Sequence, residues 1–216
     1  PFRANGYEGR ATGCISDTFI AKDFVLAYDA FFPATDDPQV IQFLSEKAKK
    51  YGFENPKTSG SLIRQNIEDG ILRDTFTAVK GARLWGNFPM HQSALIDAAV
   101  VLDSMPETKE MIDFAFRHGT ADQTKITGGS VLQRIMDEMT RDGYGNEVSP
   151  GYNYFWVSAI QEMADVLNNY ENYPKANLYN HPKVYNMVDA YIPLTLISKY
   201  TVQLGDYSNT ARNITS

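Results

Sequence analysis

A short stretch at residues 85–92, Trp-Gly-Asn-Phe-Pro-Met-His-Gln, places an indole, an amide and an imidazole just before a predicted helix. The amide of Asn87 can hydrogen-bond a substrate carboxyl group. The His91 imidazole titrates near neutral pH, where it can move a proton or carry a positive charge. The competing interpretation is structural: Asn87 caps the next helix and His91 is satisfied in the core. Trp85 adds an aromatic surface that a ligand could contact.

A second segment, residues 142–154, combines three tyrosines, a glutamate and three glycines before another predicted helix. A backbone that bends this freely can bring a phenol close to a ligand. A tyrosine acts as a base where a nearby positive charge lowers its pKa, and as an acid when it returns the proton. In the structural alternative the tyrosines pack on neighbouring helices, and Gly143 ends the preceding helix. The candidate contacts are Tyr144, Glu147, Tyr152 and Tyr154.

Helical periodicity predicts an all-α fold of antiparallel helical hairpins joined by short loops. Asp37 before Pro38 and Gly52 after Tyr51 mark the ends of one helix. No period-two strand pattern is present, and Pro193 is expected to kink or break the last helix. The helices are predicted at residues 16–32, 39–51, 62–79, 91–102, 104–119, 130–143, 154–170 and 183–204.

Composition limits the function classes. The chain has 216 residues with 20 Lys and Arg against 26 Asp and Glu, a net charge of -6, which disfavours general nucleic-acid binding. No apolar run is long enough for a membrane span. The single cysteine, Cys14, cannot form an internal disulfide. With 13 Tyr and 12 Phe, the composition suits either sugar binding or a core filled with aromatic rings.

Other motifs carry little weight. The Gly128-Gly129-Ser130 triplet lacks the lysine and preceding strand of a phosphate loop. His118 and His181 stand apart from metal-ligand partners, so no metal site and no cofactor is predicted in this chain. Glu162 and Asp165 are expected on a solvated helix face.

The two aromatic segments together resemble the heparinase II/III-like polysaccharide lyases and their alginate lyase relatives. The matching residues are Gly86-Asn87-Phe88 with His91 at a helix start, and Asp142-Gly143…Glu147…Ser149-Pro150-Gly151-Tyr152 before an aromatic helix. A Gly205-Asp206 pair after the last predicted helix is similar to that family's passage out of its toroid. The resemblance covers roughly residues 80–207.

The resemblance implies part of an (α/α) toroid over residues 1–207, followed at 208–216 by the start of a linker toward a β-sandwich absent from this chain. It implies β-elimination on an acidic polysaccharide. Asn87 would neutralise the uronate carboxyl group, Tyr152 would be the catalytic phenol and His91 a base or charge stabiliser. Tyr144 and Tyr154 remain alternative phenols.

Further expectations concern context. The first residues, Pro1-Phe2-Arg3, give the chain the character of a processed or excised segment, and the resemblance implies a periplasmic or secreted bacterial protein. Two other function classes stay open. A glycoside hydrolase would need two carboxylates across a cleft, for which Asp142 and Glu147 are the available pair. A helical module that binds glycan without chemistry would use the same aromatic loops.

Overall fold

The computed structural model describes residues 15–117, 121–122, 125–126, 129–197, 200–202 and 204–205. These parts of the chain are mostly helical, which confirms the predicted all-α class. The α-helices are α1 (Ile15–Phe31), α2 (Pro38–Tyr51), α3 (Gly60–Ile67), α4 (Arg73–Lys80), α5 (Met90–Leu102), α6 (Glu107–Phe116), α7 (Val131–Asp137), α8 (Pro150–Asn168) and α9 (Pro182–Asp189). Short 3-10 turns occupy Phe32–Asp36 (η1), Pro174–Ala176 (η3) and Leu178–Asn180 (η4).

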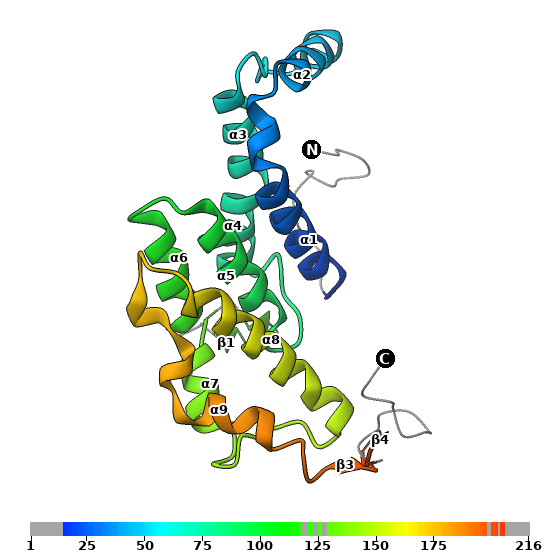
Figure 1. Cartoon of the computed structure of the whole chain (residues 1–216), viewed down its shortest axis with the longest axis vertical. Coiled ribbons are helices and arrows are strands. Elements are labelled where there is room, and N and C mark those ends of the chain that lie inside the picture. The colour runs from blue at the N-terminus through cyan, green and yellow to red at the C-terminus, as the bar shows by residue number, and fades with distance from the viewer. Residues whose placement is uncertain are drawn as a thin grey trace.

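Helix α5 lies in the middle of the molecule, and α1, α4, α6 and α8 pack against it (Figure 1). Every residue of α5 from 90 to 99 is buried. Its apolar residues run all round the helix instead of along one stripe, which is the pattern of a fully surrounded helix. Helix α2, by contrast, projects from one end of the molecule.

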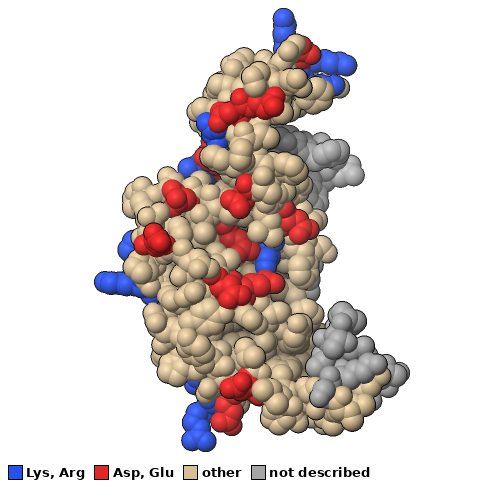
Figure 2. Space-filling view, in the orientation of Figure 1, with Lys and Arg blue, Asp and Glu red and all other residues tan. Residues whose placement is uncertain are grey.

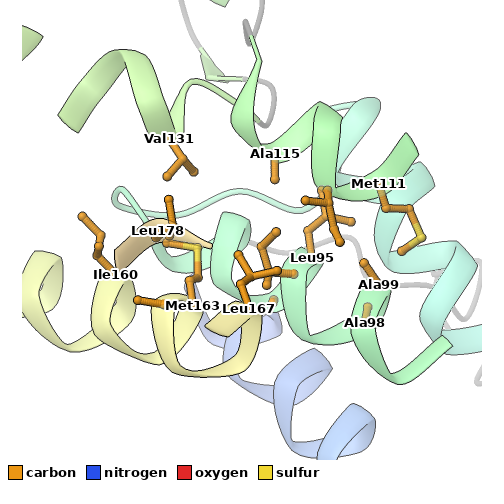
Figure 3. Close-up of a cluster of buried hydrophobic side chains, with 14 of the residues drawn as sticks. Leu95, Ala98, Ala99, Met111, Ala115, Val131, Ile160, Met163, Leu167 and Leu178 are labelled. Atoms are coloured by element: carbon orange, nitrogen blue, oxygen red, sulfur yellow. The ribbon is translucent and has the colours of Figure 1, made fainter. Parts of the chain in front are cut away.

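The hydrophobic core surrounds α5 and includes residues of α1 and α4; Figure 3 shows the part of it between α5, α6, α7 and α8. Ala98 and Ala99 of α5 face it with small side chains, which let the neighbouring helices approach closely. Leu178 of η4 closes the core from the C-terminal side. The other labelled core residues are Leu95, Met111, Ala115, Val131, Ile160, Met163 and Leu167.

The predicted ends of α2 are confirmed. The Asp37 side chain accepts hydrogen bonds from the backbone N–H groups of Gln39 and Val40, and Gly52 adopts a left-handed φ of 63°. Because these residues satisfy backbone groups that the helix leaves unpaired, the sequence determines the boundaries locally.

The helix predicted at 62–79 is interrupted. A π turn at Glu68–Leu72 (η2) joins α3 to α4. Gly70 lies in this turn. Its place there agrees with the low helix propensity of glycine, although periodicity alone predicted one continuous helix.

The last predicted helix, 183–204, is wrong in its extent. Helix α9 ends at Asp189, and a hairpin of β3 (Thr195–Leu196) and β4 (Tyr200–Thr201) follows, with Thr195 paired to Thr201. Pro193 explains the break, because it lacks an N–H and its ring clashes with the preceding turn. A second strand pair, β1 (Ala121–Asp122) and β2 (Lys125–Ile126), was also not predicted; it pairs Ala121 with Ile126.

Two other predicted boundaries shift. Helix α8 begins at Pro150, four residues before the predicted Tyr154, because a proline fits the first helical position. Helix α7 is shorter than predicted. Residues 118–120 lie outside the described residues, as do Asp206 and the predicted linker at 208–216. Within the described part of the chain, no helix combines the length and the apolar character that crossing a membrane requires.

Candidate functional site

The turn before α5 is held by His91. The Gly86 N–H donates a hydrogen bond to His91 Nδ1 at 3.2 Å, so the imidazole closes the turn back onto the helix. A Cβ at Gly86 would lie 3.5 Å from Met90 Cβ and 3.6 Å from Thr18 Cγ2. The turn therefore lies against the first turn of α5 and against α1.

His91 is only 1% exposed, and its Nε2 has no hydrogen-bond partner among the described residues. Burial and, to a smaller extent, the positive charge of Arg134 together lower the pKa of His91 to about 4. The imidazole is therefore neutral at neutral pH. This burial agrees with the structural alternative, in which His91 belongs to the core.

Asn87 does not cap α5 with its side chain. Its carbonyl oxygen accepts a hydrogen bond from the Met90 N–H at 2.8 Å, and no side-chain cap is present at the helix start. The Asn87 side chain is exposed, as is Trp85. Both side chains are therefore available to a ligand.

The loop at residues 142–149 is brought close to its neighbours by two glycines. Gly143 has a φ of +94°, and a Cβ there would lie 2.4 Å from the backbone nitrogen of Met187 in α9. A Cβ at Gly145 would lie 2.8 Å from the Trp156 ring. Gly143 thus forms a tight turn against α9. The prediction that Gly143 ends the preceding helix is wrong, because α7 ends at Asp137.

The two predicted segments meet through their aromatic residues. The ring of Phe88, from the first segment, packs edge-on against Trp156 of α8 with centroids 4.5 Å apart. Gly145, from the second segment, approaches the same indole. The Arg134 guanidinium lies 5.0 Å from the Phe88 ring centroid. Trp156 therefore links two segments that are about sixty residues apart in the sequence.

Tyr144 and Tyr154 share a partner. Tyr144 stacks on Tyr191 with ring centroids 6.0 Å apart, and Tyr154 meets the same ring edge-on at 6.3 Å. Burial raises the pKa of Tyr144, and Tyr154 is 54% exposed. The second-segment carboxylates Asp142 and Glu147 are exposed on the loop.

Tyr152 points elsewhere. It lies on the first turn of α8, and its ring is 6.3 Å from that of Phe155, one turn further along. Phe155, Ala159 and Glu162 continue the same stripe of the helix, because residues three and four apart share a face. Tyr152 therefore stands at the end of the stripe that lines a pocket.

This pocket has a volume of about 300 Å³ and lies between α1, α5 and α8. Its walls are part apolar and part polar. The apolar lining residues are Phe19, Leu26, Met90, Phe155 and Ala159, and the polar ones are Thr18, Lys22, Asp23, Ser93, Ser158 and Glu162. Gly86 lies against the lining residues Thr18 and Met90, and the Tyr152 ring neighbours the lining residue Phe155, but neither Asn87 nor Tyr152 is itself among the lining residues.

Charged groups from three helices meet beside the pocket. Lys22 of α1 donates a hydrogen bond to Ser93 Oγ of α5 at 3.1 Å and to Glu162 of α8, and its Nζ lies 3.6 Å from Asp97 Oδ2. We call these four residues the Lys22 junction. Figure 2 shows acidic side chains gathered around a basic group near the middle of this face.

Burial changes the acidity of the junction. Asp97 is 5% exposed, and burial raises its pKa to about 6, although the nearby Lys22 opposes this effect. Glu162 adds to the rise through its negative charge. The side chain of Glu162 is 54% exposed, which confirms its predicted place on a solvated helix face, and the carboxylate also pairs with Lys22.

Sequence reasoning missed the Lys22 junction. The only signal was Asp97, a single carboxylate in the otherwise apolar second half of α5; Lys22 stands among several charged residues of α1 and did not stand out. Nothing in the spacing indicated that Lys22 and Asp97, which are 75 residues apart in the sequence, would lie close together. Among the described residues, no group of three or more His, Cys, Asp or Glu side chains is arranged to hold a metal ion.

Comparison with known proteins adds no relative. No family model matches the chain, and neither a curated protein nor a solved structure matches it.

Proposed function

We propose that this chain carries the toroid side of a lyase site that cleaves uronate polysaccharides by β-elimination. One observation supports the proposal most: the two segments that predicted the chemistry, far apart in the sequence, pack against the same Trp156 ring, the first through Phe88 and the second through Gly145. Gly86, next to Asn87, lies against the pocket residues Thr18 and Met90. The Tyr152 ring lies 6.3 Å from that of Phe155, another lining residue.

In the proposed reaction a base removes the proton at C5 of the uronate, a C4–C5 double bond forms, and the bond from C4 to the 4-linked oxygen breaks. The departing oxygen takes a proton. Tyr152 would act as the base that accepts the first proton and as the acid that returns one to the leaving group. The exposed Asn87 amide would donate a hydrogen bond to the carboxyl group, where negative charge develops.

His91 takes a positioning role in this proposal. A neutral, buried imidazole is poorly placed to stabilise negative charge on a substrate, but its bond to Gly86 holds the turn that carries Asn87. Trp85, Tyr144, Glu147 and Tyr154 are proposed to contact neighbouring sugar units. The exposed rings of Trp85 and Tyr154 suit stacking on a sugar face.

The wider expectations remain part of the proposal. The helices would form part of an (α/α) toroid that works against a β-sandwich, in a periplasmic or secreted bacterial protein. The hydrolase alternative is weaker. Asp142 and Glu147 are both exposed on one loop, and Asp97 and Glu162 are both paired with one Lys22 ammonium on one side of the pocket.

The test is the Tyr152→Phe substitution in the full-length protein that contains this chain. Wild-type protein is incubated with alginate, heparan sulfate, hyaluronan and chondroitin, and the ultraviolet absorbance of the unsaturated uronate product is followed. We expect Tyr152→Phe to lower kcat by at least about a hundredfold, since general acid–base groups contribute on that order or more. Asn87→Ala is expected to lower kcat similarly.

Tyr185→Phe is the matched control, because Tyr185 is an exposed tyrosine on α9. It should leave the rate within about twofold. Unsaturated product formed by Tyr152→Phe at the wild-type rate would remove Tyr152 from the mechanism. Reducing ends released without unsaturation would favour the hydrolase, and glycan binding without any product would favour the binding module.

A further inference from the structure

The pocket between α1, α5 and α8 has features of a sugar site. Phe19 of α1 and Phe155 of α8 supply aromatic surface, and the hydroxyls of Ser93 and Ser158 supply polar contacts. A volume of about 300 Å³ lies at the lower end of the range for small-molecule sites. A pyranose ring has the matching chemistry, with an apolar face and a polar edge.

The charge of the pocket restricts which sugar it can take. The lining carries one cation, Lys22, against two anions, Asp23 and Glu162. The buried Asp97 lies behind Lys22 and pairs with it. The ammonium is thus already engaged by two carboxylates, Asp97 and Glu162. A uronate carboxylate entering this pocket would face net negative charge with no available counter-ion on the lining.

We propose that this pocket binds an uncharged or amino-bearing pyranose, and not a uronate. Its carboxylates would accept hydrogen bonds from sugar hydroxyls or an ammonium group, and Phe19 and Phe155 would contact the ring face. What this pocket implies for the substrate rests on the proposed function. The uronate addressed by Asn87 and Tyr152 would have a non-acidic neighbour, so the substrate would be a heteropolymer and not a homopolymer of uronates.

The pocket is tested directly by binding, on the full 216-residue chain. Amide chemical shifts are followed by NMR while three probes are added separately: methyl glucosaminide, methyl glucoside and methyl glucuronide. We expect the first two to shift amides of α1, α5 and α8 at the pocket. The glucuronide should bind about five- to tenfold more weakly, because a like charge at close range in partly solvated surroundings has that effect.

Two substitutions locate the site. Glu162→Gln should weaken glucosaminide binding about tenfold, as expected for loss of a hydrogen bond to a charged group, and should narrow the preference over glucuronide. Phe19→Ala should weaken all three probes several-fold. Phe19 is 49% exposed, so its removal tests the pocket without opening the core.

The controls make the same chemical changes on α2, away from the pocket. Glu46→Gln and Phe43→Ala alter exposed residues of that helix and should leave binding within about twofold. The inference is overturned if glucuronide binds as well as the other probes. It is equally overturned if no probe shifts the pocket amides, or if the control variants lose as much affinity as the pocket variants.

The two proposals fail separately. Sugar binding with the expected preference, but no unsaturated product from any polysaccharide, would remove the lyase and leave the pocket. Unsaturated product formed from alginate as fast as from the heteropolymers, with pocket variants equal to wild type, would leave the lyase and remove the pocket's role.

Discussion

The two sides of the candidate site are held together by different forces. The loop side, residues 85–91 and 142–149, is fixed by packing: the Phe88 ring lies against Trp156, and Gly143 and Gly145 allow close backbone approach. The Lys22 junction is fixed by charge, through an ammonium shared by Asp97 and Glu162. The loop side should therefore respond to changes of shape, and the junction to changes of charge and pH.

Burial acts on both sides, with opposite results for proton binding. It favours the neutral form of each group, so the pKa of His91 falls to about 4 and the pKa of Asp97 rises to about 6. At neutral pH His91 is uncharged and holds a turn. Asp97 is largely ionised and titrates within the physiological range. His91 therefore has a structural role at neutral pH, whereas the charge of Asp97 can change with pH.

The largest expected effect is on the loop side. Gly143→Ala would force a side chain into a left-handed φ of +94° and place its Cβ 2.4 Å from the Met187 nitrogen. We expect a loss of about 4 kcal/mol in the free energy of unfolding, from strain plus overpacking. Urea denaturation measures it. Gly70→Ala is the control: nothing lies within 4 Å of its Cβ, so stability should be equal or higher. A loss of less than 1 kcal/mol in Gly143→Ala would mean that this close approach does not hold the loop.

The next effect belongs to the Lys22 junction. Lys22→Met leaves the Asp97 carboxylate buried without its cation, which is expected to cost about 3 kcal/mol in the free energy of unfolding at pH 7. The double variant Lys22→Met with Asp97→Asn should recover much of this loss. Lys47→Met on α2 is the matched control. If the double variant were as unstable as Lys22→Met, charge would not be what Lys22 supplies.

The smallest effect is a pair of opposite pH slopes. The pKa of His91 is lowered on folding, so below pH 6.5 the unfolded chain binds a proton that the folded chain does not, and stability falls. Asp97 does the reverse, because its raised pKa makes the folded chain bind the extra proton below pH 6. Between pH 7 and pH 5 we expect about 2 kcal/mol lost through His91 and about 1 kcal/mol gained through Asp97.

Two variants separate these slopes. His91→Gln should remove the loss, so its free energy of unfolding should fall less than that of wild type on acidification. Asp97→Asn should remove the gain and steepen the fall. Denaturation curves at pH 5, 6 and 7 measure both. Parallel pH profiles for wild type and the two variants would contradict the assigned burial of these groups.

Some features of the fold and the site could be predicted from the sequence, and others could not. The ends of α2 were predictable, because Asp37 and Gly52 act on backbone groups within the same turn. The break before β3 was only half predicted: Pro193 marked it, but the sequence did not show that α9 would end at Asp189. The candidate residues Asn87 and Tyr152 were visible as residue types in unusual loops. The meeting of their two segments at Trp156 was not.

The sequence by itself determined the helical class, the locally capped helix ends and the two aromatic segments, because these depend on neighbours within a few residues. Only the tertiary structure decided that Trp156 links the segments and that Lys22 meets Asp97 and Glu162. It also decided that His91 is buried and neutral. Burial and charge pairing depend on how distant helices pack around α5, and no local pattern specifies that packing.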